Sequence, residues 1–133
     1  MRLVVDANIL FSALYDMDST AGGLLFLAIE EQLELFSSEH VKKEMRRILM
    51  AKLGYSEREV DELVSALPVE WLEEGLYEDA MGEAMAILQD EADASLLACA
   101  SVLACDVVSG DKMVLAGKFR KVRVRRLREF KDP

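Results

Sequence analysis

Two aspartates stand at the ends of short apolar runs in the sequence. Asp6 directly follows the branched run RLVV at residues 2–5, and Asp111 follows DVVS at residues 106–109 after one glycine. Runs of this kind predict buried strands. Because ligand crevices form at the carboxyl ends of the strands in a parallel α/β sheet, the two carboxylates are expected at one edge of such a sheet.

Two further acids lie on helix faces that the sequence periodicity assigns to the core. At about 100° per residue, Asp93 shares a stripe with Leu96. Glu44 falls between Val41 and Met45, and the lysines and arginines around it point the other way. A glutamate on an apolar face must be desolvated or paired, so Glu44 has the weakest structural explanation of the four acids.

Each of the other three acids has an ordinary explanation when it is considered alone. Asp93 in the first turn of a helix interacts favourably with the helix dipole. Asp6 can cap the helix that follows it, and Asp111 lies between glycine and lysine as a turn residue does. Four anions cannot all be buried without a counter-charge, however, and no basic residue shares their predicted faces. A divalent cation meets this need, and hard oxygen ligands select Mg²⁺ or Mn²⁺.

The elements that would position these acids alternate along the chain. Ser38 is expected to cap one helix that Gly54 stops, Ser56 and Glu59 form a capping box for the next, and Thr20 is a candidate cap for an earlier one. Strands are predicted at 2–5, 33–37, 69–71, 106–109 and 121–127, and helices at 9–15, 20–31, 38–53, 56–67, 76–88 and 91–104. This order predicts an α/β fold, a three-layer α/β/α sandwich with a short-stranded, mostly parallel central sheet.

Length and composition bound the class of protein. The 133 residues fit one domain spanning 1–133, with no linker tract or repeat. The apolar N-terminal run is broken by Asp6 and Asn8 far short of the about 18 residues that a membrane span or signal segment would suggest. Cys99 and Cys105 are predicted to be buried, reduced packing cysteines, which favours a cytoplasmic location.

The charge is unevenly distributed. The net charge of −9 argues against a protein that coats nucleic acid in general. Residues 118–133 nevertheless hold eight Lys or Arg against two Asp or Glu, whereas the first 117 residues hold eight against 23. This basic stretch is either a guide for a nucleic acid or an edge strand protected by charge.

The sequence resembles the PIN-domain family of metal-dependent ribonucleases, which includes the VapC-type toxins of toxin–antitoxin pairs. The segment VVDANIL is similar to the family's strand-end aspartate followed by an asparagine, which are Asp6 and Asn8 here. SSEHVKKEMRRIL resembles the family's acidic helix, and DEADASLLACA resembles the segment that carries the third acid. DVVSGDKMVL is similar to the strand that ends in Ser/Thr-x-Asp, which gives Ser109 and Asp111.

The resemblance implies hydrolysis of RNA by metal-activated water. Asp6, Asp93 and Asp111 would be the main ligands of Mg²⁺ or Mn²⁺, and Glu44 would be a ligand or an orienting group. Supporting hydrogen bonds are expected from Asn8, Ser109 and Asp90, and guidance of the RNA is expected from Lys112, Arg123, Arg125 and Arg126. The partners implied are an RNA substrate and, as open alternatives, an antitoxin protein and a second copy of the chain, with no membrane.

Three points stay open at the level of sequence. A haloacid-dehalogenase-like phosphatase also has an aspartate after its first strand, but it needs a second aspartate where Asn8 stands. A non-catalytic PIN-like scaffold that binds RNA or protein would keep the same acids. Apolar helix residues could form a dimer face, although the core accounts for them equally: Met17, Leu24, Leu25, Phe26 and Met81. His40 is expected to be a surface or capping residue.

Overall fold

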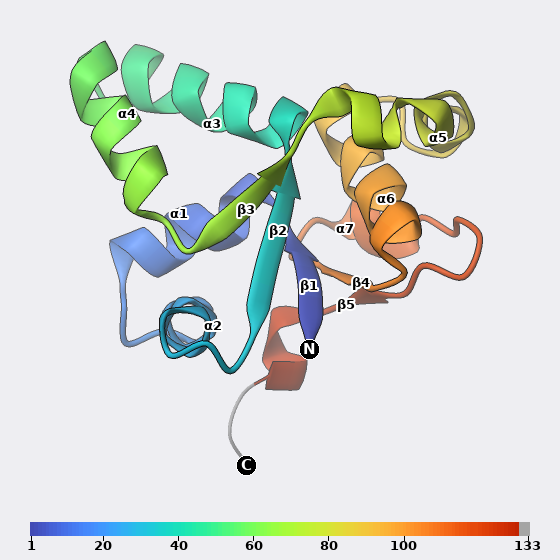
Figure 1. Cartoon of the computed structure of the whole chain (residues 1–133), viewed down its shortest axis with the longest axis horizontal. Helices are drawn as coiled ribbons and strands as arrows, with labels where there is room; N and C mark the ends of the chain where they lie inside the picture. Colours follow the sequence, from blue (N-terminus) through green and yellow to red (C-terminus); the bar gives the residue numbers. More distant parts are fainter. Residues whose placement is uncertain (131–133) are drawn as a thin grey trace.

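A five-stranded sheet forms the centre of the molecule in the computed structural model, which describes residues 1–130 (Figure 1). The strand order is β3-β2-β1-β4-β5, and each neighbouring pair of strands is parallel. The strands are β1 (Arg2–Val5), β2 (Glu34–Ser38), β3 (Val69–Leu72), β4 (Asp106–Val108) and β5 (Val124–Arg125). The predicted fold class is therefore confirmed, whereas a domain boundary at 133 lies outside the described residues.

Helices cover both faces of this sheet. The three consecutive residues Leu3, Val4 and Val5 of β1 are all fully buried although they point to alternate faces, so each face is covered. The helices are α1 (Ala7–Tyr15), α2 (Thr20–Ile29), α3 (Glu39–Ala51), α4 (Glu57–Ala66), α5 (Glu74–Ile87), α6 (Glu91–Leu103) and α7 (Lys112–Ala116), followed by the 3₁₀ helix η1 (Leu127–Phe130). Helix α6 packs against β1, β2 and β4 and is buried along most of its length.

Local capping signals placed most helix starts correctly. Ser38 ends β2 and caps α3, with its Oγ accepting a hydrogen bond from the Val41 N–H at 2.9 Å. The capping box of Ser56 and Glu59 is present at α4. The cap of α2 is Ser19, which accepts from the Gly22 N–H at 3.1 Å, so the assignment to Thr20 is wrong. Ser19 and Thr20 are adjacent in the sequence, and the side chain of Ser19 is the one that caps the helix.

The C-terminal part of the described chain differs most from expectation. Helix α7 was not predicted, because its five residues are too few to show an apolar period. The strand expected over 121–127 is reduced to Val124–Arg125, and the chain then turns into η1. Cys99 is buried as expected, but Cys105 is only half-buried; both thiols are free. Among residues 1–130, no helix is long and apolar enough to cross a membrane.

Candidate functional site

The end of β1 positions the first acid. Asp6 is the N-cap of α1, and its Oδ1 accepts a hydrogen bond from the Ile9 N–H at 2.9 Å. Its Oδ2 accepts from the hydroxyl of Ser109 at 2.5 Å. The two residues meet because β1 and β4 are paired in parallel with Val5 opposite Val108, so the residues that follow the two strands are neighbours. The side chain of Asp6 is held at both oxygens and is only 6% exposed.

Ser109 also connects the first acid to Asp111. Its hydroxyl oxygen accepts from the Asp111 N–H at 3.0 Å while its hydrogen is donated to Asp6. Asp111 is the N-cap of α7, and its Oδ1 accepts from the Met113 N–H at 2.7 Å. The fully buried serine therefore sets the spacing between two carboxylates that belong to different turns.

Helices α6 and α3 bring the other two acids. Asp90 caps α6 through a 3.0 Å hydrogen bond from the Asp93 N–H, which places Asp93 in the first turn. Glu44 lies in the middle of α3. Both carboxylates are half-buried, so Glu44 is less buried than its place on the apolar face of the helix suggested. The exposed Arg47, three residues further along α3, opposes the rise in the pKa of Glu44 through its charge.

The four acids line one small pocket at the carboxyl edge of the sheet. Its volume is about 20 Å³, enough for a water molecule or a small ion. We call it the acid pocket, and the side chains that line it are those of Asp6, Ala7, Asn8, Val41, Glu44, Ala92, Asp93, Leu96 and Asp111. Five of the residues selected from the sequence are thus brought together. Ser109 lies behind them, and Asp90 caps the helix beside them.

The electrostatics of the acid pocket reflect the crowding of like charges. Burial first, and then the charges of Asp90, Asp111, Glu44 and Asp6, raise the pKa of Asp93 to about 6. Burial also raises the pKa of Asp6, against the lowering effect of the hydrogen bonds from Ser109 and Ile9 and with a further rise from Asp111. The pKa of Glu44 is raised by burial and by Asp90 and Asp6, whereas Arg47 lowers it. A cation in the pocket would relieve this repulsion.

The donor set fits Mg²⁺ or Mn²⁺ in chemistry, because it consists of carboxylate oxygens. Within residues 1–130, however, no group of three His, Cys, Asp or Glu side chains is arranged to hold a metal ion directly. Mg²⁺ usually keeps several water ligands and contacts one or two carboxylates. The pocket therefore fits an ion held partly through water rather than a closed protein cage.

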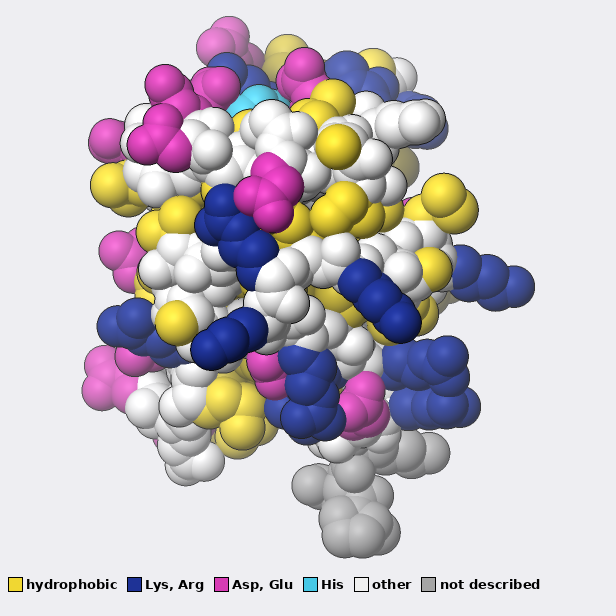
Figure 2. All heavy atoms as spheres, turned by 90° about the vertical axis from the view of Figure 1, so that its right-hand side faces the viewer, with side chains coloured by type: hydrophobic (Ala, Val, Ile, Leu, Met, Phe, Trp, Pro, Cys, Tyr) yellow, Lys and Arg dark blue, Asp and Glu magenta, His cyan; other side chains and the backbone are white. Residues whose placement is uncertain are grey.

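The basic residues selected from the sequence lie elsewhere or on the rim. Lys112 is exposed at the start of α7, beside Asp111. Glu129 lies 3.7 Å from Arg123 and 3.5 Å from Arg125, and it accepts the Arg126 N–H at 2.6 Å. On the face drawn in Figure 2, Lys and Arg side chains are interspersed with apolar and acidic ones rather than joined in one band. The role of Arg123, Arg125 and Arg126, here called the arginine cluster, stays a prediction.

Sequence reasoning missed the position of His40. Its side chain is 16% exposed, and its Nδ1 lies 2.6 Å from the hydroxyl of Tyr77 on α5. A surface or capping role was therefore the wrong expectation. The contact joins residues 37 apart in the chain, and no local pattern marks it. Among the proposed dimer residues, Leu24 and Leu25 belong to the core, while Met17 and Phe26 are exposed.

Comparison with known proteins agrees with the fold. The family model of the PIN domain matches residues 4–129, so the chain belongs to the PIN-domain family. Among curated protein sequences, none matches this chain.

Solved structures of low sequence identity share the fold. The structure of VapBC2 from Rickettsia felis, bound to a DNA fragment from its promoter, has a TM-score of 0.70 and 15% identity, over 95% of this chain and 98% of that chain. PAE2754 from Pyrobaculum aerophilum has a TM-score of 0.62 and 19% identity, over 97% and 85% of the two chains. FitAcB from Neisseria gonorrhoeae has a TM-score of 0.60 and 16% identity, over 92% and 95%.

Proposed function

We propose that this protein is a Mg²⁺- or Mn²⁺-dependent endoribonuclease whose active site is the acid pocket. The observation that carries the proposal is the convergence of four carboxylates, from the ends of β1 and β4 and from α3 and α6, on one pocket. Membership of the PIN-domain family supports a nuclease and removes support for the haloacid-dehalogenase-like phosphatase.

The four acids and Ser109 would have different roles in this site. Asp6, Asp93 and Asp111 would hold the ion, directly or through water, and Glu44 would bind it or orient one of its waters. Such an ion lowers the pKa of a bound water and neutralises charge on the phosphate. Ser109 keeps Asp6 in place by its hydrogen bond, a task that the ligands of a metal site commonly need.

The rim of the pocket supplies contacts for the substrate. Asn8 is exposed where it lines the pocket, so its amide is free to reach a phosphate or a sugar. Lys112 is exposed beside Asp111 and would attract the phosphate chain. The arginine cluster would guide RNA only by exchanging its contacts with Glu129 for phosphate. An acidic protein can bind RNA in this way, because the metal reverses the local charge.

The biological setting that we propose is that of a toxin controlled by an antitoxin. The similar structures include VapBC2 bound to promoter DNA, and FitAB bound to the IR36 DNA fragment has a TM-score of 0.59 and 17% identity, over 94% of each chain. An antitoxin protein, a homodimer and a cytoplasmic location follow as parts of this proposal. Co-expression with the product of a neighbouring small gene, followed by co-purification, tests the antitoxin.

A non-catalytic scaffold is the second candidate, because no group of three ligands is preassembled among the described residues. A cleavage assay with a fluorescent single-stranded RNA separates the two. The proposal expects cleavage with Mn²⁺ that EDTA abolishes, and Glu44→Gln should lower the rate by about two orders of magnitude or more without a large loss of RNA binding. RNA binding without cleavage in any divalent metal would favour the scaffold. Wild-type cleavage and Mn²⁺ affinity in Glu44→Gln would remove Glu44 from the site.

A further inference from the structure

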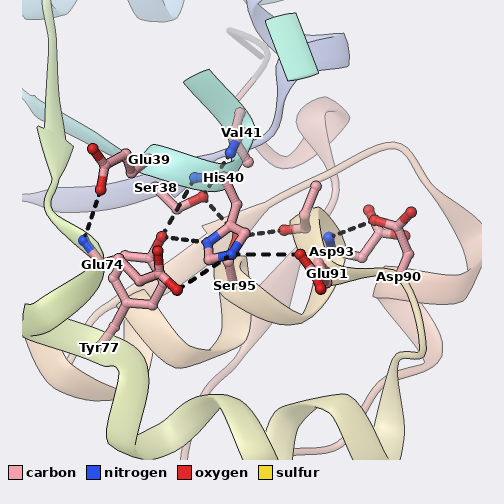
Figure 3. A network of polar contacts seen from close by, with 11 residues as sticks. Ser38, Glu39, His40, Val41, Glu74, Tyr77, Asp90, Glu91, Asp93 and Ser95 are labelled. Carbon is pink, nitrogen blue, oxygen red and sulfur yellow. Dashed lines mark hydrogen bonds and ion pairs between the residues drawn. The ribbon is translucent and has the colours of Figure 1, made fainter. Parts of the chain in front are cut away.

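A polar network joins the first turns of three helices beside the acid pocket (Figure 3). His40 is the second residue of α3, and its Nδ1 lies 2.6 Å from the hydroxyl of Tyr77 on α5. The same hydroxyl accepts the backbone N–H of His40 at 3.4 Å. The Nε2 atom faces the carboxylates of Glu74 on α5, at 3.8 Å, and Glu91 on α6, at 3.7 Å. One imidazole therefore contacts both of the helices that lie next to α3 here.

The hydroxyl of Tyr77 can bond both the backbone and the ring of His40. Its side chain is fully buried, and burial raises the pKa of its phenol to about 12, so the hydroxyl keeps its proton. Its oxygen accepts the His40 backbone N–H, and its hydrogen can be donated to Nδ1 in the tautomer in which that nitrogen carries no proton. In that tautomer the ring N–H is on Nε2, which is the nitrogen that faces Glu74 and Glu91.

A second contact reinforces the same junction. Ser95 of α6 donates its hydroxyl hydrogen to the Ala92 carbonyl at 2.5 Å, so the hydroxyl of Ser38 is the donor in the 2.6 Å bond between the two serines. Both serines are fully buried. The end of β2, which caps α3, is thereby bonded to α6 two residues beyond Asp93.

This junction lies close to two acids of the pocket. Glu44 follows His40 by one turn of α3, and Asp93 follows Glu91 by two residues in α6. The placement of one helix on the other sets the separation of these carboxylates. We propose that His40 is a positioning residue of the ribonuclease site: its bond to Tyr77 holds the first turn of α3 against α5, beside the Ser38–Ser95 contact with α6, so that Glu44 and Asp93 share the acid pocket.

This proposal rests on the proposed function, and its test separates position from general stability. His40→Ala and Tyr77→Phe should each lower kcat about 10- to 100-fold, because a small misplacement of catalytic groups has effects of this size. KM should stay within about threefold in both, since neither side chain is proposed to bind RNA. The double variant should be no slower than the slower single variant, since both changes break one contact.

Conservative substitutions identify the atom that matters. In His40→Asn the amide oxygen stands near the place of Nδ1 and accepts from Tyr77, so kcat should stay within about fivefold of wild type. In His40→Gln the amide reaches instead toward the place of Nε2, so this variant should resemble His40→Ala. The control is Arg46→Ala, which breaks the ion pair with Asp61 on the side of α3 that faces α4 and should lower stability without lowering kcat.

The outcomes are distinct. Wild-type kcat in both His40→Ala and Tyr77→Phe overturns the positioning role while leaving the ribonuclease proposal standing. A change in KM alone overturns it as well and assigns His40 to RNA contact, in the open groove of about 400 Å³ that it lines with Lys43 and Glu44. If wild-type protein cleaves no RNA, amide hydrogen exchange decides: faster exchange in the first turns of α3 and α6 of His40→Ala supports the junction, and unchanged exchange overturns it.

Discussion

Asp93→Asn in metal-free protein tests the repulsion in the acid pocket most directly. The pKa of Asp93 is raised from 3.8 to about 6, so its ionised form is disfavoured in the folded state. A shift of about two units corresponds to an upper bound of about 3 kcal/mol, and the half-buried setting reduces this to about 1–2 kcal/mol. Loss of the favourable contact with the helix dipole removes about 0.5 kcal/mol. The expected net gain in the free energy of unfolding is about 1 kcal/mol at pH 8.

The pH dependence of that gain follows from the direction of the shift. A carboxyl group whose pKa is higher in the folded state favours folding while it is protonated, and this benefit is lost as the pH rises through about 6. Wild-type protein should therefore lose stability relative to Asp93→Asn between about pH 4 and pH 7, and the two should differ little at pH 4. Mn²⁺ should reverse the order at pH 8 by binding the wild-type site more tightly.

Urea unfolding in EDTA at several pH values, repeated with Mn²⁺, measures both effects. Glu57→Gln is the matched control, because it removes a charge from the first turn of α4, away from the acid pocket, and reports the loss of the dipole contact alone. If Asp93→Asn is less stable than wild type at every pH without metal, the like-charge reasoning is refuted and Asp93 is a structural group of α6.

Three further predictions concern the metal, the RNA and the fold. Mg²⁺ or Mn²⁺ should raise the melting temperature of the wild type in a scan against EDTA, and an unchanged temperature at millimolar metal would contradict a shared site. Replacing the arginine cluster with glutamine should weaken RNA affinity and reduce the dependence of that affinity on salt, while Mn²⁺ affinity stays constant. Unchanged RNA binding at all salt concentrations would mean that these arginines only solvate the edge strand. Gly22→Ala should destabilise the protein by about 1–3 kcal/mol in urea unfolding, because its Cβ would stand 2.1 Å from a backbone oxygen. The control Gly23→Ala, which meets nothing within 4 Å, should be neutral or stabilising; equal effects would mean that the backbone of the α1–α2 turn relaxes.

The sequence predicted those parts of the site whose placement follows from local rules. Asp6 directly follows β1, and Asp111 follows β4 after two residues. A parallel sheet brings the ends of its strands to one edge, so the two carboxylates are expected there without further information. The burial of Glu44 was overestimated, because periodicity gives the face of a helix but not where the neighbouring element ends.

Contacts between residues distant in sequence could not be predicted from the chain. His40 and Tyr77 meet because α3 and α5 both begin at the carboxyl edge of the sheet, directly after the adjacent parallel strands β2 and β3. Tyr77 alone has the sequence appearance of one apolar residue in an amphipathic helix. The contacts of Glu129 with the arginine cluster likewise depend on the 3₁₀ helix η1, which no capping residue or apolar period in the sequence predicted.

The arrangement around Ser109 shows why position and chemistry are linked in this fold. A serine between β4 and α7 has one hydrogen to donate, and it goes to Asp6 across the sheet, while its oxygen accepts from Asp111 two residues on. Slippage of β4 by one residue against β1 would turn this side chain to the opposite face and separate the two carboxylates. The pairing of Val5 with Val108, which apolar burial enforces, therefore also fixes the distance between two acids of the pocket. Stability of the central strands and assembly of the proposed metal site are consequences of the same register.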